Sequence, residues 1–314
     1  ASLNDPYTKF LKSDSFSKQK VIIDSKISGI GIIFDKSDDK TVINHVLKDS
    51  PAQNAEILPG DTVLSINGKD TKDKAIKKIV EDIEAGKTEK VTLTIKRDDK
   101  IIKKELTKKD IYFKTMDYNS YKDGIAIIRM SNMMGEKAPE DFKKILEKTN
   151  NEKVIIMDLR NNNGGILVNA AEMANYMLNP CKMMSIESRV NTKYKIYSDE
   201  ETIFKPKPVI ILINRYTASA AEIFAGILRD NSNAILIGEN SYGKNSIQQI
   251  IPFYNGTGLI LTTDKYLLSF GEDINKIGLK PDIYINQNKY ETPDKDKQLK
   301  KALNLAEEIV KSGK

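Results

Sequence analysis

The sequence predicts a mixed α/β protein: a larger α/β core with a smaller inserted domain of α+β type. In residues 108–290, four short apolar runs resemble strands, and segments of helical period lie between them. Strands that alternate with helices are typical of a layered α/β sheet. Residues 27–107 instead carry alternating strand patterns bounded by glycines, and 314 residues are enough for two domains.

The predicted core strands are Ile125–Arg129, Val154–Met157, Val209–Ile213 and Ala234–Ile237. Val209–Ile213 is apolar at every position, which indicates a strand buried on both faces, as in a parallel sheet. The predicted helices of the core cover Phe142–Lys148, Ile166–Leu178 and Glu222–Arg229.

The remaining segments frame this core. Residues 1–26 form a lead-in with a predicted helix, and within residues 27–107 we expect a helix over Ala75–Ile83 and a strand over Val91–Ile95. Lys96–Asp110 is lysine-rich with charges of both signs, which predicts a solvated hairpin at the domain boundary. Residues 291–314 hold an amphipathic helix that packs on the core or on a second subunit, so a homodimer stays open.

Composition excludes several classes of protein. The chain is 39% hydrophobic and 30% charged, and its net charge of +6 comes from interspersed signs without a basic, aromatic-rich patch, so we expect no nucleic-acid partner. The longest apolar run is far short of a membrane span. The single cysteine, Cys181, excludes an internal disulfide, and without a His/Cys ligand set we expect no metal and no cofactor.

Ser219 is the first candidate for chemistry. It lies on a turn between the strand Val209–Ile213 and an amphipathic helix, among the small residues Ala218, Ala220 and Ala221. At a helix start, free backbone N–H groups point outward and can stabilise an oxyanion. The alternative from this turn alone is that Thr217 or Ser219 only caps the helix.

A serine nucleophile needs a base, and Lys244 is the best candidate. The one histidine, His45, lies in an alternating segment without an acidic partner, so we interpret it as structural. The known alternative to a histidine base is a lysine in its neutral form. Its pKa must be lowered by about three units to act near neutral pH, which corresponds to a free energy of about 4 kcal/mol. Burial alone can supply a shift of this size. Lys244 follows a buried strand and Gly243, and Gln248 lies four residues on, placed to orient the amine.

Six segments together resemble the C-terminal processing (tail-specific) peptidase family, the Ser–Lys proteases that carry a PDZ module. In order, they are Asp5–Leu11, Gly29–Ile32, Asp158–Gly165 (DLRNNNGG against DLRNNPGG), Ala218–Glu222 (ASAAE against ASASE), Tyr242–Gln248 (YGKNSIQ against FGKGSVQ) and Leu279–Ile283. The departures are Asn163 for a proline, Ala221 for a serine and Asn245 for a glycine. None removes a catalytic side chain, but Asn163 weakens the expectation of a rigid glycine loop.

The resemblance implies a core with the ClpP/crotonase-like fold and assigns roles to individual residues. The nucleophile falls on Ser219, the base on Lys244 and the glutamine that positions the base on Gln248. The oxyanion donors fall on the backbone of Gly164 or Gly165 and of Ala220. Supporting positions fall on Glu222, Asp230 and Ser241.

For the small domain, the resemblance implies a PDZ-like module that recognises substrate tails. Its peptide-binding loop falls on Gly29, Ile30, Gly31 and Ile32, where backbone N–H groups hold a C-terminal carboxylate and the strand edge takes up the peptide. The implied partners are protein or peptide substrates with accessible C-terminal tails. The family usually carries an export signal or anchor, so we expect an extracytoplasmic location and a signal or membrane anchor in a removed N-terminal segment. The alternative for this domain is a small β-rich module that binds no peptide.

Two other functions compete with a protease. Gly238–Asn245 nearly matches the phosphate-binding loop of ATPases, but Asn245 stands where a hydroxyl should bind magnesium, and Pro252 comes too soon for the long helix that follows such a loop. The second is a catalytically inactive PDZ peptide-binding scaffold, against which the presence of Ser219, Lys244 and Gln248 argues.

Overall fold

The computed structural model describes residues 5–37, 40–47, 49–84, 89–188, 193–198, 202, 204–286 and 295–312. The chain forms two compact units: residues 1–25 with 114–314, and residues 26–113. In sequence, the smaller unit therefore interrupts the larger. It is longer than the predicted span of 27–107 because β9 (Lys109–Tyr112) pairs with β2 (Lys26–Gly29).

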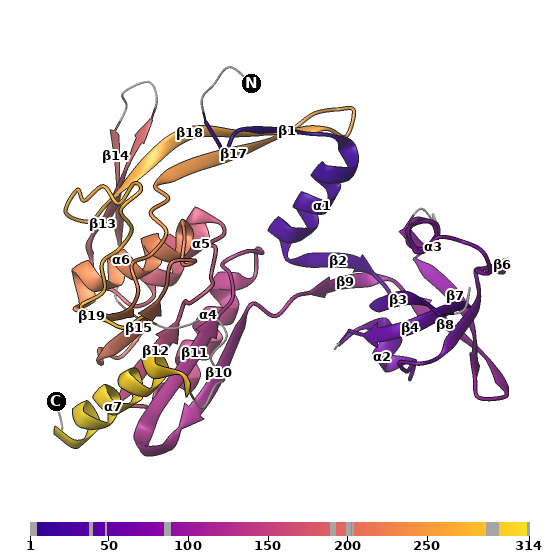
Figure 1. Cartoon of the computed structure of the whole chain (residues 1–314), viewed down its shortest axis with the longest axis horizontal. Coiled ribbons are helices and arrows are strands. Elements are labelled where there is room, and N and C mark those ends of the chain that lie inside the picture. The colour runs from indigo at the N-terminus through magenta and orange to yellow at the C-terminus, as the bar shows by residue number, and fades with distance from the viewer. Residues whose placement is uncertain are drawn as a thin grey trace. The chain divides into compact units, whose positions relative to one another are not determined.

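The larger unit is built on a six-stranded sheet in the order β10-β11-β12-β15-β16-β19 (Figure 1). The strands are β10 (Met116–Tyr121), β11 (Ile125–Met130), β12 (Val154–Asp158), β15 (Val209–Ile213), β16 (Ile235–Gly238) and β19 (Ile283–Tyr284). From β11 to β19 they run parallel, while β10 is antiparallel to β11 across the short turn η1 (Lys122–Gly124). The four predicted core strands and the parallel pairing are confirmed.

Both faces of this sheet are covered by helices, which explains the unbroken apolar runs. In β15, Val209, Ile211 and Ile213 belong to the core under α4 (Ala138–Lys148), α5 (Leu167–Asn175) and α6 (Ala220–Ser232). The alternate residues, Ile210 and Leu212, pack with Ala302 and Ala306 of α7 (Lys297–Ser312) on the opposite face. The C-terminal helix therefore packs on its own core, which decides between the two arrangements left open by the sequence.

A second, five-stranded sheet in the larger unit joins segments far apart in sequence. Its order is β1-β18-β13-β14, and β17 also pairs with β18; Figure 1 shows β1 and β17 running along β18. The strands are β1 (Lys9–Leu11), β13 (Cys181–Ser188), β14 (Lys193–Ser198), β17 (Ser246–Pro252) and β18 (Gly258–Leu268), and α1 (Ser13–Asp24) follows β1. The lead-in is thus an integral strand of this sheet, through the antiparallel register of Lys9 with Ile260.

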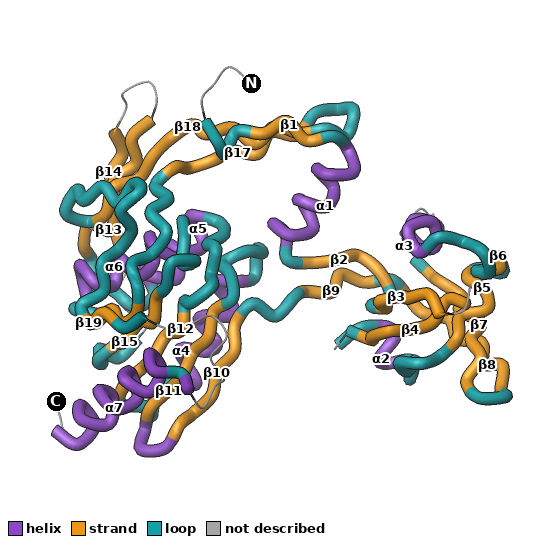
Figure 2. Tube along the Cα trace, viewed as in Figure 1, coloured by secondary structure: helices purple, strands orange, loops and turns teal. Residues whose placement is uncertain are grey.

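The smaller unit is β-rich, with a sheet in the order β3-β4-β5-β7-β8 and β6 paired to β5 (Figure 2). Its elements are β3 (Ile32–Ser37), β4 (Lys40–Val46), α2 (Pro51–Asn54), β5 (Thr62–Ile66), β6 (Lys69–Asp70), α3 (Ile76–Glu84), β7 (Lys90–Arg97) and β8 (Lys100–Thr107). A hairpin is present but begins earlier than the predicted Lys96–Asp110, because β7 and β8 pair from Lys90 with Thr107 to Arg97 with Lys100 within this sheet. In this sheet, β3 is an edge strand.

Candidate active site

Three turns meet at one edge of the six-stranded sheet. The carboxyl ends of parallel strands lie at the same edge, so the turns after β12, β15 and β16 are neighbours. They carry Gly164 with Gly165, Ser219, and Lys244, respectively. Backbone hydrogen bonds fasten them together: Ala218 N donates to Asn162 O at 2.9 Å, and Tyr242 N donates to Thr217 O at 2.9 Å.

Ser219 occupies the sharp turn between β15 and α6. Its φ of 56° and ψ of −121° lie where residues other than glycine are uncommon, and such strain, of about 1–3 kcal/mol, is typical of functional sites. Ser219 and Glu222 stand in a capping-box arrangement in which Ser219 N donates to the Glu222 carboxylate at 2.8 Å, while the hydroxyl makes no side-chain cap hydrogen bond. Ser219 is therefore the N-cap residue of α6, and this position does not exclude a chemical role for its half-buried hydroxyl.

Glu222 connects the Ser219 turn to the Lys244 turn. Its Oε2 accepts from Ser219 N at 2.8 Å and from Lys244 N at 2.9 Å, and its Oε1 accepts from Gly243 N at 2.7 Å and from Ser241 Oγ at 2.5 Å. The side chain is fully buried. Burial raises the pKa of this carboxyl, while the four donors oppose that rise. Glu222 and Ser241 therefore lie between the Ser219 and Lys244 turns; their supporting role stays a prediction.

Lys244 is half-buried beside this cluster. Burial lowers the pKa of its ammonium group, with Glu222 and Asp5 raising it and Lys9 lowering it further. Its Nζ lies 4.7 Å from the centroid of the Tyr7 ring. Among the hydrogen bonds of the described residues, none joins Lys244 Nζ to Ser219 Oγ, although one carboxylate holds both backbones.

The glycine loop after β12 lies directly against the serine turn. A methyl group at Gly164 would come within 2.6 Å of Ala218 O and 2.8 Å of Ala220 N, and φ is +94° there, so a side chain would collide. Gly164 N donates to Asn162 Oδ1 at 2.8 Å. Neither Gly165 N nor Ala220 N donates to any acceptor within the described ranges. These two amides are thus available to a ligand, and Gly164 N is already engaged.

Asn162 was not singled out from the sequence, yet it organises this loop. It is fully buried, its Nδ2 donates to Met130 O at 2.9 Å, and its Oδ1 accepts from Gly164 N. A rigid glycine loop is therefore held by a side chain, in a chain where Asn163 replaces the proline of the motif. The run of three asparagines after Arg160 carried no signal that separated this one from its neighbours.

Gln248 and Asp230 do not join the cluster. Gln248 Nε2 donates to Ser246 Oγ at 3.0 Å and to Thr262 Oγ1 at 3.1 Å, and within the described residues no hydrogen bond links Gln248 to Lys244. Asp230 lies near the C-terminal end of α6, where it pairs with Arg229 at 2.8 Å. Its position eleven residues beyond Ser219 along a helix puts it about 16 Å away.

The predicted peptide-binding loop has free donors at the edge of the small-domain sheet. Ile30 and Gly31 accept backbone hydrogen bonds from Ala52 and Leu47, but their own N–H groups have no acceptor among the described residues. Gly31 has φ +80°, and a methyl group there would overlap the Ser50 side chain at 2.2 Å. The loop therefore places two free amides just before the edge strand β3, which begins at Ile32.

Other candidates lack a comparable arrangement. His45 is exposed on β4 of the smaller unit. Burial raises the pKa of the Cys181 thiol, which disfavours the nucleophilic thiolate. The segment Gly238–Asn245 leads into strand β17, whereas a phosphate-binding loop opens a helix. Within the described residues there is no group of three or more His, Cys, Asp or Glu that could hold a metal, and no helix long and apolar enough to cross a membrane.

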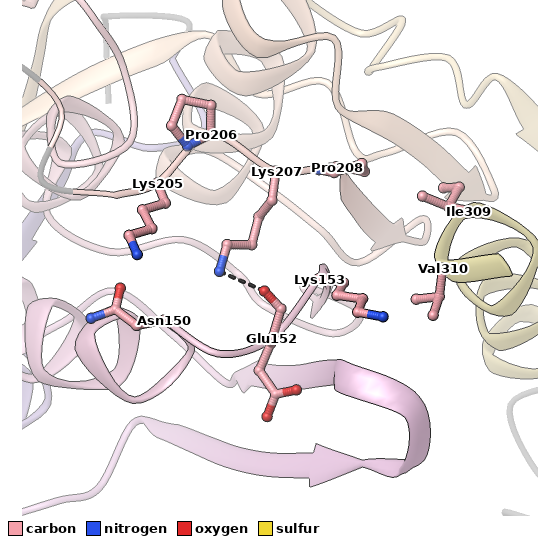
Figure 3. A pocket seen from close by; sticks show the side chains of 9 residues that line it. All are labelled: Asn150, Glu152, Lys153, Lys205, Pro206, Lys207, Pro208, Ile309 and Val310. Atoms are coloured by element: carbon pink, nitrogen blue, oxygen red, sulfur yellow. Dashed lines mark hydrogen bonds between the residues drawn. The ribbon is translucent and has the colours of Figure 1, made fainter. Parts of the chain in front are cut away.

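A cavity of about 410 Å³ lies at the opposite edge of the sheet, beside the segments that lead into β12 and β15 (Figure 3). Burial lowers the pKa of its Lys207, as it does for Lys244. However, Lys207 Nζ donates to the carbonyls of Thr149 and Glu152, each at 2.7 Å. Its amine therefore holds the turn that follows α4 through two hydrogen bonds, whereas no hydrogen bond of Lys244 Nζ is found among the described residues.

Comparison with known proteins gives matches over most of the chain. The model of peptidase family S41 matches residues 124–285, and that of the PDZ domain matches residues 28–107. A protein of Staphylococcus aureus named "Probable CtpA-like serine protease" is 31% identical over 294 residues, covering 92% of this chain and 59% of the relative. The chain thus spans about three-fifths of the length of that relative.

A "Carboxyl-terminal-processing protease" of Picosynechococcus sp. is 31% identical over 298 residues, covering 91% of this chain and 71% of the relative. Among solved structures, the photosystem II D1 C-terminal processing protease aligns with a TM-score of 0.54 at 21% identity. It covers 90% of this chain and 79% of that one. At this identity the structural likeness concerns the fold alone, and it agrees with the predicted core architecture.

Proposed function

The chain belongs to peptidase family S41, as the resemblance of its motifs predicted, and we propose that it is a serine endopeptidase with Ser219 as nucleophile and Lys244 as general base. The observation that carries this proposal is the Glu222 carboxylate, which accepts from both Ser219 N and Lys244 N. The buried Glu222 carboxylate thereby fixes the position of the turn that carries the proposed nucleophile relative to the turn that carries the proposed base.

The proposed reaction follows the usual two stages of acyl transfer. Neutral Lys244 accepts the proton as Ser219 Oγ attacks the scissile carbonyl carbon. The resulting oxyanion accepts hydrogen bonds from Gly165 N and Ala220 N, neither of which has an acceptor among the described residues. Lys244 then gives the proton to the leaving amine, and a water molecule, deprotonated by Lys244, releases the acyl group from Ser219.

The state of Lys244 supports its role as base. Burial lowers its pKa, so a larger fraction is neutral near pH 7 than for a solvated lysine. The absence of a Ser219–Lys244 hydrogen bond in the described structure does not argue against the pair, because such contacts often tighten only when substrate binds. Gln248 lies on the strand that follows Lys244, and we propose that it positions the amine in that bound state.

Hydrolysis of casein tests the assignment. Ser219→Ala and Lys244→Ala should both reduce cleavage to a trace, and Lys244→Arg should do the same because a guanidinium does not give up its proton. Ser232→Ala, at the far end of α6, is the matched control and should remain active. Full activity of the Ser219 or Lys244 variants would refute the pair, and an inactive wild type that binds peptides would favour the inactive scaffold.

For the PDZ domain we propose recognition of a substrate C-terminus. The free amides of Ile30 and Gly31 suit a carboxylate, and the open edge of β3 suits an added strand. Phe34 of β3 belongs to the same buried core cluster as Ile79 and Ile83 of α3, so this helix is packed close to the edge strand. Substrates that differ only in a free or amidated C-terminus test this, and equal cleavage of both would refute it.

The family resemblance also leads us to propose that the protein works outside the cytoplasm. Fractionation of source cells with an antibody against this chain tests the location. Recovery in the cytoplasmic fraction alone would refute it.

A further inference from the structure

The segment before β1 is folded onto the base of the candidate active site. The Asp5 carboxylate accepts from Tyr7 N at 3.2 Å and from Thr8 N at 3.0 Å, which bends the chain into a tight turn. Thr8 Oγ1 accepts from Thr262 N at 3.1 Å, and Lys9 begins the pairing of β1 with β18 (Figure 1). This anchored turn holds the Tyr7 ring against Lys244.

The contact between the ring and the amine is close. Lys244 Nζ lies 4.7 Å from the ring centroid, well inside the distance of about 6 Å at which a cation and an aromatic face interact. Among the hydrogen bonds of the described residues, none involves this Nζ. The Tyr7 ring is therefore a principal contact of the proposed base, and it comes from the far end of the sequence.

We infer that Tyr7 is a positioning residue, whose ring excludes water from the Lys244 amine and so keeps the proposed base available in its neutral form. This inference rests on the proposed role of Lys244. It assigns a part in the chemistry to the amino-terminal segment Asp5–Leu11, to which the resemblance gave no role.

The surrounding charges determine the sign of the effect. Lys244 faces Glu222 of α6 and Asp5 of the amino-terminal turn, which both raise its pKa, and Lys9 of β1, which lowers it; burial is the largest influence and lowers it. A cation over the ring face is attracted by the negative face of the ring, which favours the charged form of Lys244 and so opposes burial. Burial is the largest influence on the pKa of Lys244, and the Tyr7 ring, 4.7 Å from Nζ, forms part of the cover that keeps water from this amine.

The Tyr7 hydroxyl does not add a charge in the working range. Burial, together with a hydrogen bond to Tyr242, raises the pKa of Tyr7 to about 12. The phenol therefore stays neutral at pH 7–10, and the ring itself is what acts on the lysine. This makes Tyr7→Phe, Tyr7→Leu and Tyr7→Ala an informative series, since they remove the hydroxyl, the aromatic face and the cover in turn.

The experiment is the pH profile of kcat/KM for wild type and these three variants. Tyr7→Phe and Tyr7→Leu keep the amine covered. In these two variants the rise of kcat/KM with pH, which reports the deprotonation of Lys244, should occur at the wild-type pH or lower. Tyr7→Ala should move that rise to higher pH, lowering activity about tenfold at pH 7 with recovery above pH 9, since one pKa unit changes the neutral fraction about tenfold. Phe10→Ala is the control, because this exposed ring on β1 stacks on Phe253 instead.

A second measurement separates this inference from the proposed function. In a Ser219→Ala background, the pKa of Lys244 is followed by NMR of its ε-carbon with and without Tyr7→Ala, which requires no hydrolysis. A higher pKa in the Tyr7→Ala protein supports the inference even if the protein proves to be no protease. An unchanged or lower pKa, or a Tyr7→Ala profile reduced equally at every pH, overturns it.

Discussion

Replacing Glu222 with glutamine changes one oxygen of a buried group that four donors share. The carboxylate accepts from the N–H groups of Ser219, Gly243 and Lys244 and from the Ser241 hydroxyl. Glutamine has the same shape but one acceptor oxygen and an NH₂ group. The hydroxyl of Ser241, which already accepts from Leu279 N, can turn to accept from that NH₂ as well, so the least costly orientation strands the Gly243 N–H and takes the present acceptor from the Ser241 O–H.

The size of the effect follows from these contacts. A stranded buried N–H costs about 1–3 kcal/mol, and each of the two hydrogen bonds that remain on the amide oxygen loses about 1 kcal/mol without the charge. Burying a neutral group instead of a carboxylate offsets part of this loss. We therefore expect Glu222→Gln to destabilise the larger unit by about 2–4 kcal/mol. Loss of register between the two turns should lower kcat/KM about 100-fold.

Glu239→Gln is the matched control for this prediction. Glu239 is also a buried carboxylate, on the turn after β16, but it pairs with the exposed Arg215 at 2.7 Å. An amide oxygen still accepts from that guanidinium, so the change should cost less than about 1 kcal/mol and leave hydrolysis intact. Urea unfolding and peptide hydrolysis are measured for both variants. If Glu222→Gln loses no more stability or activity than Glu239→Gln, the account of Glu222 as the connection between the turns is refuted.

Three further perturbations follow from the same structure. The pKa of Lys244 is lower in the folded protein than in the unfolded chain, where it is about 10.5. Between these two pKa values the unfolded chain holds the lysine proton more tightly, so the contribution of Lys244 to the free energy of unfolding rises with pH. Lys244→Met should therefore melt above wild type at pH 7, with an advantage that shrinks toward pH 10.5; a pH-independent difference in Tm would contradict this. Gly164→Ala should abolish hydrolysis through its collision with the serine turn, whereas Gly271→Ala, which also has positive φ but open space, should cost only about 1 kcal/mol and stay active. Arg160→Ala removes the ion pairs of the largely buried Asp158 and Asp296 and should cost about 3–5 kcal/mol in urea unfolding, and a loss below about 1 kcal/mol would show that these ion pairs contribute little.

Much of the core could be predicted because the signals are local. An apolar run such as Val209–Ile213 has only one stable environment, the interior of a sheet covered on both sides, and the structure places helices on both faces. A serine flanked by small residues between that strand and a helix must lie at the carboxyl edge of the sheet. The same reasoning applies to Lys244 after β16, so both candidate residues were found without tertiary information.

Tertiary structure alone decided how these residues are held. The roles of Asn162 and Tyr7 depend on contacts with Met130 and Lys244, which lie 32 and 237 positions away in sequence, and no local pattern encodes such a contact. Which of Gly164 N and Gly165 N can donate to a ligand depends on the fold, because Gly164 N already donates to the Asn162 side chain. Sequence determined which groups reach the edge of the sheet, because strand burial and chain direction are local properties. The fold determined which of those groups remain free to react, because hydrogen-bond partners and exclusion of water arise only when distant segments pack together.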